Sequence, residues 1–152
     1  MKFKGTQIAI DMYGCSDEVI SNPEAVEAIL REAIVEYHME ERAVHYNAED
    51  NGEYSLIVPC KRGHINLHVY PQLGFAAVDV FTVNDAANPD KLAVYLRAKF
   101  APDKSKITFL ERGDFGSQND MKPRRKSQIK TIRRAKNAGN ALKKLMMRPK
   151  SL

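Results

Sequence analysis

The sequence predicts an α+β fold, a two-layer sandwich in which two helices cover one face of a largely antiparallel sheet. Three observations within residues 1–114 support this class. Segments with strand-like alternation cluster in the middle of this region, and only two segments combine helical spacing with a helix-start signal. No Gly-rich turn joins a strand to a helix, so the Rossmann and P-loop classes have no support.

The predicted elements follow one another closely. By residue number they are a strand at 6–13, a helix at 21–39, strands at 43–47, 53–60, 63–70 and 74–83, a helix at 88–100 and a strand at 105–113. The first strand is indicated by Ile8, Ile10 and Met12, which alternate with polar residues. The first helix has a capping residue, Ser21 or Asn22, before a proline that fits its first turn.

Turn residues separate the later elements. The Asn-Gly pair at 51–52 predicts a turn before the third strand. The segment Pro-Gln-Leu-Gly at 71–74 favours a reversal, so the strands on either side should form a hairpin. The second helix repeats the start signal of the first, with Asn88 as the cap and Pro89 behind it, and a last strand closes the body.

Basic and acidic residues are distributed unevenly along the 152 residues, whose formal net charge is +5. The segment from Met121 to the C-terminus contains twelve Lys or Arg and no Asp or Glu. The first 120 residues hold the other twelve basic residues against all nineteen acidic ones, a net charge of −7. We therefore expect an acidic domain at 1–114 and a basic appendage at 115–152.

The composition also bears on the cellular compartment. No apolar run is long enough to span a membrane, and the N-terminal segment lacks the features of a signal peptide, so we expect a soluble cytoplasmic protein. Two cysteines, Cys15 and Cys60, are too few for a zinc site or a disulfide framework and are expected to be free thiols.

The strand at 63–70 should carry a polar row on one face. Its residues 65, 67 and 69 are apolar and should point into the core, since side chains alternate along a strand. The opposite face then holds His64, Asn66, His68 and Tyr70. The two histidines would be roughly 13 Å apart on a strand, so no metal site is expected. Two interpretations remain open: an exposed sheet face that carries histidines, or a row that binds a ligand or a second subunit.

Several segments together resemble the short bacterial and archaeal form of S-adenosylmethionine decarboxylase. These are QIAIDMYGC, NPEAVEAILREA and SLIVPCKRGHINLHVYPQLGFAAVDVFTV, and the resemblance covers about residues 5–113. The family motif reads Glu-Ser-His-Ile-x-Ile-His-x-x-Pro-Glu-x-Gly-Tyr-Ala-Ala-x-Asp-x-Phe-Thr-Cys-Gly, where this chain reads RGHINLHVYPQLGFAAVDVFTVN. The resemblance implies the fold of that family and a link to polyamine (spermidine) biosynthesis.

The resemblance also implies that the reactive groups of the family are missing. Members of the family cleave themselves between the Glu and the Ser, and the Ser becomes a pyruvoyl group that forms a Schiff base with the substrate amine. The matching residues here are Arg62 and Gly63, and glycine has no hydroxyl from which a pyruvoyl could form. The proton-donating cysteine of the family falls on Val83. We therefore expect no pyruvoyl cofactor in this chain.

Other positions implied by the resemblance remain polar. His68 and Ser55 match residues that assist self-processing, and Tyr70 matches an aromatic position beside them. Gln72 matches a glutamate that binds the ribose hydroxyls, and Glu49 falls where some members have an aromatic residue that stacks on adenine. The candidate ligand site is therefore Tyr70, Gln72, His64, Asn66 and Glu49, beside the retained His68 and Ser55.

Three functions remain open. The first is a pseudoenzyme of the lyase family that has lost the pyruvoyl mechanism and acts as a binding or regulatory subunit, as a homodimer or as a heterodimer with a decarboxylase homologue. The second is an active enzyme on S-adenosylmethionine or a related amine, which would need another electron sink. The third places the function in the basic appendage.

The appendage should form an amphipathic helix from about residue 126 to 147, because apolar residues recur there at three- and four-residue intervals. Its basic residues are Arg124, Arg125, Lys126, Lys130, Arg133, Arg134, Lys136, Lys143 and Lys144. The open partners are the acidic body of a subunit, nucleic acid in weak nonspecific contact, or an anionic membrane surface. Residues 121–152 contain no aromatic side chain, which argues against single-strand recognition by this segment.

Overall fold

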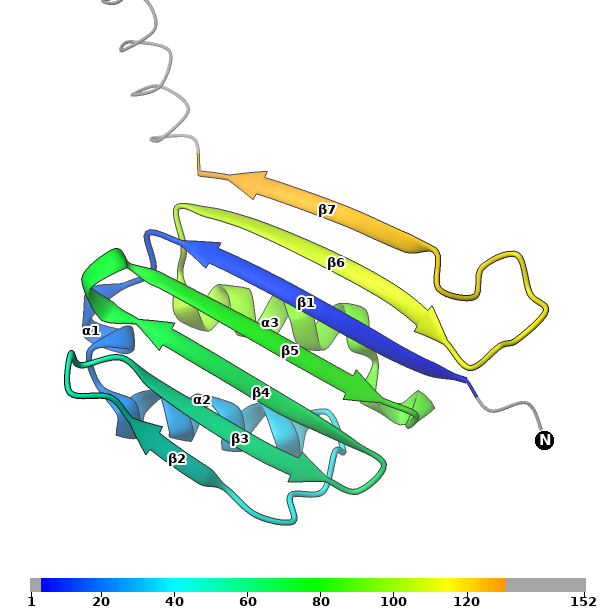
Figure 1. Ribbon diagram of the computed structural model, residues 1–152, viewed down its shortest axis with the longest axis horizontal. Coiled ribbons are helices and arrows are strands. Elements are labelled where there is room, and N and C mark those ends of the chain that lie inside the picture. The colour runs from blue at the N-terminus through cyan, green and yellow to red at the C-terminus, as the bar shows by residue number, and fades with distance from the viewer. Residues whose placement is uncertain (1–3, 131–152) are drawn as a thin grey trace, which may run out of the picture.

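The computed structural model describes residues 4–130 of the chain. It has two layers, a seven-stranded antiparallel sheet and a pair of helices that both lie on one face of it (Figure 1). The α+β sandwich predicted from the sequence is confirmed. The other face of the sheet carries no element of the described chain, and we call it the open face.

Seven strands build the sheet, and the first of them pairs with two strands that come much later in the sequence. The seven strands are β1 (Gly5–Tyr13), β2 (His45–Ala48), β3 (Tyr54–Cys60), β4 (Gly63–Tyr70), β5 (Phe75–Thr82), β6 (Lys104–Arg112) and β7 (Pro123–Ile129). Their order across the sheet is β2-β3-β4-β5-β1-β6-β7. Since β2 through β5 form a meander, β4 and β5 lie at the centre, next to β1.

Local capping signals set where the two long helices start. They are α2 (Pro23–Glu36) and α3 (Pro89–Phe100), and a short helix α1 (Asp17–Ile20) precedes them. The side-chain oxygen of Asn22 accepts a hydrogen bond from the Ala25 backbone N–H, and that of Asn88 accepts one from Lys91. Both predicted helix starts are confirmed, whereas the one-turn helix α1 was not predicted. None of the helices among residues 4–130 is long and apolar enough to cross a membrane.

The core lies between the sheet and the helices. Strand alternation sends Ile8 and Ile10 of β1, and Ile65 and Leu67 of β4, toward the helices, where all four are essentially inaccessible to solvent. At roughly 25 cal/mol per Å² of buried apolar surface, side chains of this size contribute about 1.5–3 kcal/mol each. The same alternation turns the intervening residues onto the open face.

The main difference from the expected elements concerns the basic appendage. Residues 126–129, expected to begin a helix, belong to β7, which pairs with β6 so that Lys126 lies opposite Ile107. A helix here would have left the β6 edge unpaired, whereas β7 satisfies its backbone groups. The rest of the expected helix, with Arg133, Arg134 and the lysines at 136, 143 and 144, lies outside the described residues.

Two basic side chains fasten β7 to the helical layer. Arg124 and Lys126 point toward the helices, and both form salt bridges with Asp90 at the start of α3, at 3.3 and 3.2 Å. The same two cations lie over the ring of Phe109, at 4.3 and 5.4 Å from its centroid. These contacts hold the appended strand against the body.

Candidate functional site

The polar row of β4 lies on the open face, as predicted. Ile65, Leu67 and Val69 are buried, while His68 is exposed and the other members of the row are half-buried. His68 lies between Ser55 of β3 and Ala77 of β5 in the cross-strand register. This register joins two candidate residues that are thirteen positions apart in sequence.

Four of the predicted site residues line one pocket. Glu49, Ser55, His68 and Tyr70 surround a cavity of about 590 Å³ at the end of β4, next to the hairpin that joins β2 to β3. The full lining is Asn47, Glu49, Asp50, Asn51, Glu53, Tyr54, Ser55, His68, Val69 and Tyr70. The volume falls within the roughly 300–1,000 Å³ typical of small-molecule sites.

Gln72 lies at the edge of this pocket. It belongs to the 3-10 turn between β4 and β5, and its side-chain amide donates a hydrogen bond of 3.1 Å to the carbonyl of Asn51. The contact ties the β4–β5 turn to the acidic hairpin that forms the opposite wall. In this structure Gln72 therefore shapes the pocket through a backbone contact.

The pocket is acidic. Glu49, Asp50 and Glu53 come from the hairpin after β2, and no Lys or Arg is among the lining residues. The Asn47 side-chain amide donates a hydrogen bond of 3.0 Å to Glu49, which orients that carboxylate. A positively charged ligand fits this charge distribution best.

Two neighbouring hydroxyl groups of β3 in the pocket, those of Tyr54 and Ser55, differ in their hydrogen bonding. The Tyr54 hydroxyl donates a hydrogen bond of 2.8 Å to the carbonyl of Ile20, and burial raises the pKa of Tyr54 above its ordinary value, so this group stays neutral. Ser55 is only 9% exposed, and within the described chain its hydroxyl has no hydrogen-bond partner. Of the two, the Ser55 hydroxyl is the one left for a ligand.

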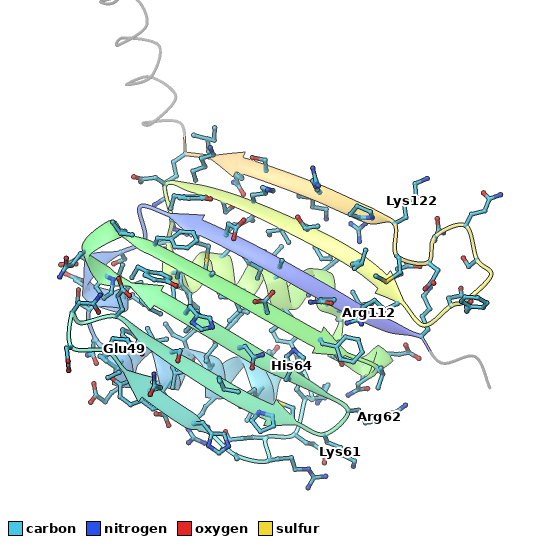
Figure 2. The ribbon with its side chains drawn as sticks, viewed as in Figure 1. Glu49, Lys61, Arg62, His64, Arg112 and Lys122 are labelled. Atoms are coloured by element: carbon cyan, nitrogen blue, oxygen red, sulfur yellow. The ribbon has the colours of Figure 1, made fainter. Side chains whose placement is uncertain are left out.

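The remaining predicted positions lie at the other end of the sheet. Lys61 and Arg62 form the two-residue turn between β3 and β4, and Figure 2 shows them far from Glu49, along the length of the strands. Gly63 starts β4, and five residues of strand, about 17 Å, separate it from His68. Val83 is beside the turn, where its backbone N–H donates a 3.0 Å hydrogen bond to the Arg62 carbonyl.

The predicted site is therefore divided between two ends of one face. The pocket end holds Ser55 and His68, and the turn end holds Arg62, Gly63 and Val83. His64 and Asn66 lie between them on β4. In the sequence, only the strand period indicates this division, because it separates residues 63 and 68 along β4.

Gly63 occupies a position without space for a side chain. A Cβ atom built there would collide with the carbonyl oxygen of Phe81 on the neighbouring strand β5. Sequence reasoning found the absent hydroxyl but not this close approach of two backbones. A glycine inside a strand often marks such an approach.

His64 and Asn66, between the two ends, have different surroundings. The His64 ring lies 5.9 Å from the Phe81 ring. The side-chain oxygen of Asn66 is buried without a hydrogen-bond partner among the described residues, and Asp79 lies opposite it on β5. A hydrogen-bond donor brought onto the open face could satisfy this oxygen.

The thiols of the two cysteines are buried and protonated, so neither is a ready nucleophile. Burial raises the pKa of both the Cys15 and the Cys60 thiol to about 11, so neither is a thiolate at neutral pH. Cys60 faces Gly63 in the β3–β4 register, but its thiol contacts the carbonyl of Val58. Among residues 4–130, no three His, Cys, Asp or Glu side chains cluster as metal ligands would.

A family model described as S-adenosylmethionine decarboxylase matches residues 6–113. The chain belongs to the S-adenosylmethionine decarboxylase family. Two relatives, both named S-adenosylmethionine decarboxylase proenzyme, come from Clostridium kluyveri and Moorella thermoacetica. The first is 31% identical over 118 residues, 78% of this chain and 94% of the relative. The second is 34% identical over 113 residues, which cover 74% of this chain and 90% of the relative.

A solved S-adenosylmethionine decarboxylase has the same fold. The crystal structure of the enzyme from Aquifex aeolicus VF5 superposes with a TM-score of 0.64 at 22% identity and covers 79% of this chain and 98% of its own. The match to the S-adenosylmethionine decarboxylase model ends at residue 113, ten residues before β7 begins. Strand β7 thus lies beyond the part of the chain that the family model matches.

Proposed function

We propose that this member of the S-adenosylmethionine decarboxylase family serves polyamine biosynthesis without cleaving itself, as a binding or regulatory subunit. The observation that carries the proposal is Gly63, which stands where the family motif has its serine. The position lacks the hydroxyl, and the Phe81 carbonyl leaves no space for one. The residues present do not fit a pyruvoyl group.

The side chains near Gly63 supply neither a pyruvoyl group nor a proton donor in place of the family's serine and cysteine. The Cys60 thiol is protonated at neutral pH and held on the side of the core, and Val83 carries no transferable proton. Decarboxylation of an amino acid needs an electron sink, which no side chain near the turn supplies. These features weigh against the alternative of an active enzyme that works by another mechanism.

The pocket end supports ligand binding. Three carboxylates suit the positively charged sulfonium and ammonium groups of S-adenosylmethionine, and Ser55 and His68 can form hydrogen bonds with it. Glutamine at position 72 lacks the charge of the family's glutamate, and its amide is engaged by Asn51. We therefore expect weaker recognition of the ribose than in the active family members.

The division of the site supports assembly with a second chain. One copy cannot bring its turn end to its pocket end, because both lie on the same rigid strand β4. Two open faces that meet through β4 and β5 with their strands reversed would place the turn end of one chain at the pocket end of the other. In a heterodimer, a decarboxylase homologue would supply its own serine and cysteine beside the pocket of this chain.

The first test is an intact-mass spectrum of the full chain, followed by calorimetric titration with S-adenosylmethionine. We expect one unprocessed chain of 17.2 kDa that binds the ligand. Two fragments that meet near residue 62 would contradict the loss of self-cleavage, and an unprocessed chain without binding would contradict the ligand-binding role. Release of carbon dioxide by the purified chain would favour the alternative of an active enzyme.

A further inference from the structure

The outer side of the helical layer, away from the sheet, carries a shallow groove, which we call the helix groove. It encloses about 630 Å³ and is lined by Ala28, Arg31, Glu32, Val35, Glu36 and Tyr95. We propose that the C-terminal segment of the same chain, residues 131–152, docks in this groove. The inference is independent of the proposed function, because two chains that meet through their open faces leave their helices on the outside.

Contacts between α2 and α3 hold the helix groove in shape. The Tyr95 hydroxyl of α3 donates a hydrogen bond of 2.7 Å to the Glu32 carboxylate of α2, and Lys99 forms a salt bridge of 3.0 Å with the same carboxylate. Val35 stands on the α2 side with 76% of its surface exposed. A second hollow of about 460 Å³ begins on the other side of Val35. An apolar side chain laid over this valine would remove its surface from water.

The part of the chain that contains α2 is strongly acidic. Residues 17–42 contain eight Asp or Glu and two Arg, a net charge of −6. Glu24 and Glu36 are exposed, and within residues 4–130 neither of them forms a salt bridge. Their four-residue spacing puts them on the same face of α2 as Ala28 and Glu32. A basic segment along α2 would therefore meet carboxylates that lack a cation partner in the described chain.

The sequence of residues 131–152 complements this surface. It contains seven Lys or Arg and no Asp or Glu. Apolar residues recur in it at three- and four-residue intervals, at positions 132, 135, 138, 142 and 145. A helix of this sequence would present an apolar stripe flanked by cations. Such a stripe matches a groove that has exposed apolar side chains and an acidic rim.

The described chain ends close to the helix groove. The ammonium group of Lys130 donates a hydrogen bond of 3.0 Å to the carbonyl of Ala101, the residue directly after α3. Tyr95 lies six residues before Ala101, about 9 Å along the axis of α3. The 22 residues that follow Lys130 would form a helix of about 33 Å, so they can reach and fill the groove. Attachment to the same chain also gives the segment an effective concentration in the millimolar range.

The charges of α3 indicate how the segment lies. This helix carries Lys91, Arg97 and Lys99 against a single Asp90, and only Lys99 is balanced by Glu32 across the groove. A basic segment should therefore follow α2 and not α3. A phosphate backbone or an acidic peptide would be repelled by the carboxylates of α2, so neither fits the helix groove.

The first test is zero-length carbodiimide cross-linking of the full chain, with the joined peptides identified by mass spectrometry. We expect isopeptide bonds between lysines of the segment and carboxylates of α2, that is, between Lys136, Lys143 or Lys144 and Glu24, Glu32 or Glu36. Mixing native and isotope-labelled chains beforehand shows whether a bond joins one chain or two. Bonds only to the acidic hairpin after β2, or bonds between two chains, would overturn the proposal.

Tryptic cleavage of the segment measures how tightly it docks. Trypsin cuts a docked segment only when it leaves the groove, so cleavage in the full chain should be about tenfold slower than in a free peptide of residues 131–152. Replacing Glu24 and Glu36 with Gln should accelerate it about fivefold. Glu18→Gln with Asp85→Asn is the charge-matched control, since both carboxylates are exposed outside the groove. Equal rates in the native chain and the free peptide, or equal acceleration in both double variants, would overturn the proposal.

Val35 tests the apolar part of the contact. Val35→Ser changes an exposed side chain, so the fold should be unaffected while cleavage of the segment accelerates about threefold. Val94→Ser is the matched control, because Val94 is 47% exposed on α3 and does not line the groove. Equal rates in these two variants would rule out docking in the groove. Protection that appears only after heparin is added would assign the segment to a polyanion and overturn the proposal.

Discussion

At the scale of single residues, Gly63 combines two deficits that have separate consequences. The missing hydroxyl is visible in the sequence, and under the proposed function it is the group from which a pyruvoyl would form. The missing space is visible only in the structure, because it arises from the Phe81 carbonyl on a neighbouring strand. Residue type can be read from a motif, but the distance between two backbones depends on the sheet twist and register.

Gly63→Ala should destabilise the fold. A methyl group at this position must displace the backbone of β5, so the free energy of unfolding should fall by about 1–3 kcal/mol in a urea titration. Gly52→Asn is the control, because nothing lies within 4 Å of a Cβ atom at position 52 and asparagine tolerates its positive φ. Equal stability of the Gly63→Ala variant and the native chain would show that the β5 backbone can move away from position 63 without a cost in free energy.

Gly63→Ser should not restore self-cleavage. The new hydroxyl would be strained against the Phe81 carbonyl, and Arg62 and Val83 would still replace the family residues beside it. Intact-mass spectrometry of the variant should show a single chain. Fragments that meet near residue 62 would mean that the turn can adopt a reactive geometry.

His68→Ala should weaken binding of S-adenosylmethionine about 10–100-fold, the loss expected for a hydrogen bond to a charged ligand. His64→Ala is the matched control, since His64 lies on the same strand face but does not line the pocket. Calorimetric titration of both variants measures the difference. Equal losses in the two variants would place the ligand elsewhere on the open face.

At the scale of elements, the starts of the two long helices depend on local contacts, whereas strand β7 depends on a distant part of the chain. Asn22 and Asn88 cap their helices through contacts that span three residues, so the sequence alone predicted both helix starts. Strand β7 has no such signal, because Arg124 through Ile129 become a strand by pairing with β6. The apolar spacing that predicted a helix begins only at Ile129, and for the residues before it the unpaired edge of the sheet decided the outcome.

The docking of β7 should depend on pH through Asp90. Partial burial acts against it, but hydrogen bonds from Arg124 and Lys126 hold the pKa of Asp90 below its ordinary value of 3.8. A carboxyl group with a lowered pKa stabilises the folded state above its ordinary pKa, and this contribution is lost as the pH falls through the lowered value. The stabilisation by Asp90 should thus be complete at pH 6, begin to fall near pH 4 and disappear only below the lowered pKa.

Hydrogen exchange measures this effect locally. At pH 6, Asp90→Asn should raise the exchange rates of the β7 amides while those of β4 stay unchanged, since an exposed ion pair contributes only about 0–1 kcal/mol to global stability. Below pH 3.8 the intrinsic exchange rates differ from those at pH 6, but the difference between the native chain and the variant should shrink as the pH falls. Native-like protection of β7 in the variant at pH 6 would show that backbone pairing alone holds the strand.

At the scale of the whole molecule, the sequence predicted the layers and the order of the central strands but not the shape of the site. Alternation along β1 and β4 predicted which of their residues are buried. These residues form one apolar face of the sheet, which the helices cover. The pocket depends on how the hairpin after β2 meets the turn at Gln72, which is a contact over 21 residues. Such long-range contacts carry no periodic signature.

Deleting residues 121–152 should leave a folded and more acidic protein. The buried side chains that form the core all lie between Ile8 and Phe109, so cooperative thermal unfolding should persist. The transition should shift to lower temperature, because the loss of β7 uncovers Phe109 and opens the β6 edge. An unfolded or insoluble product would show that β7 is part of the folding unit.

The close approach at Gly63 also bears on how such a protein can evolve. A serine at this position would require β4 and β5 to lie slightly farther apart at the turn. With glycine in place, a serine that arose by mutation would therefore bring a clash as well as a hydroxyl. Under the proposed function, this close approach would oppose the return of a reactive serine, and selection would act on the pocket and on β7.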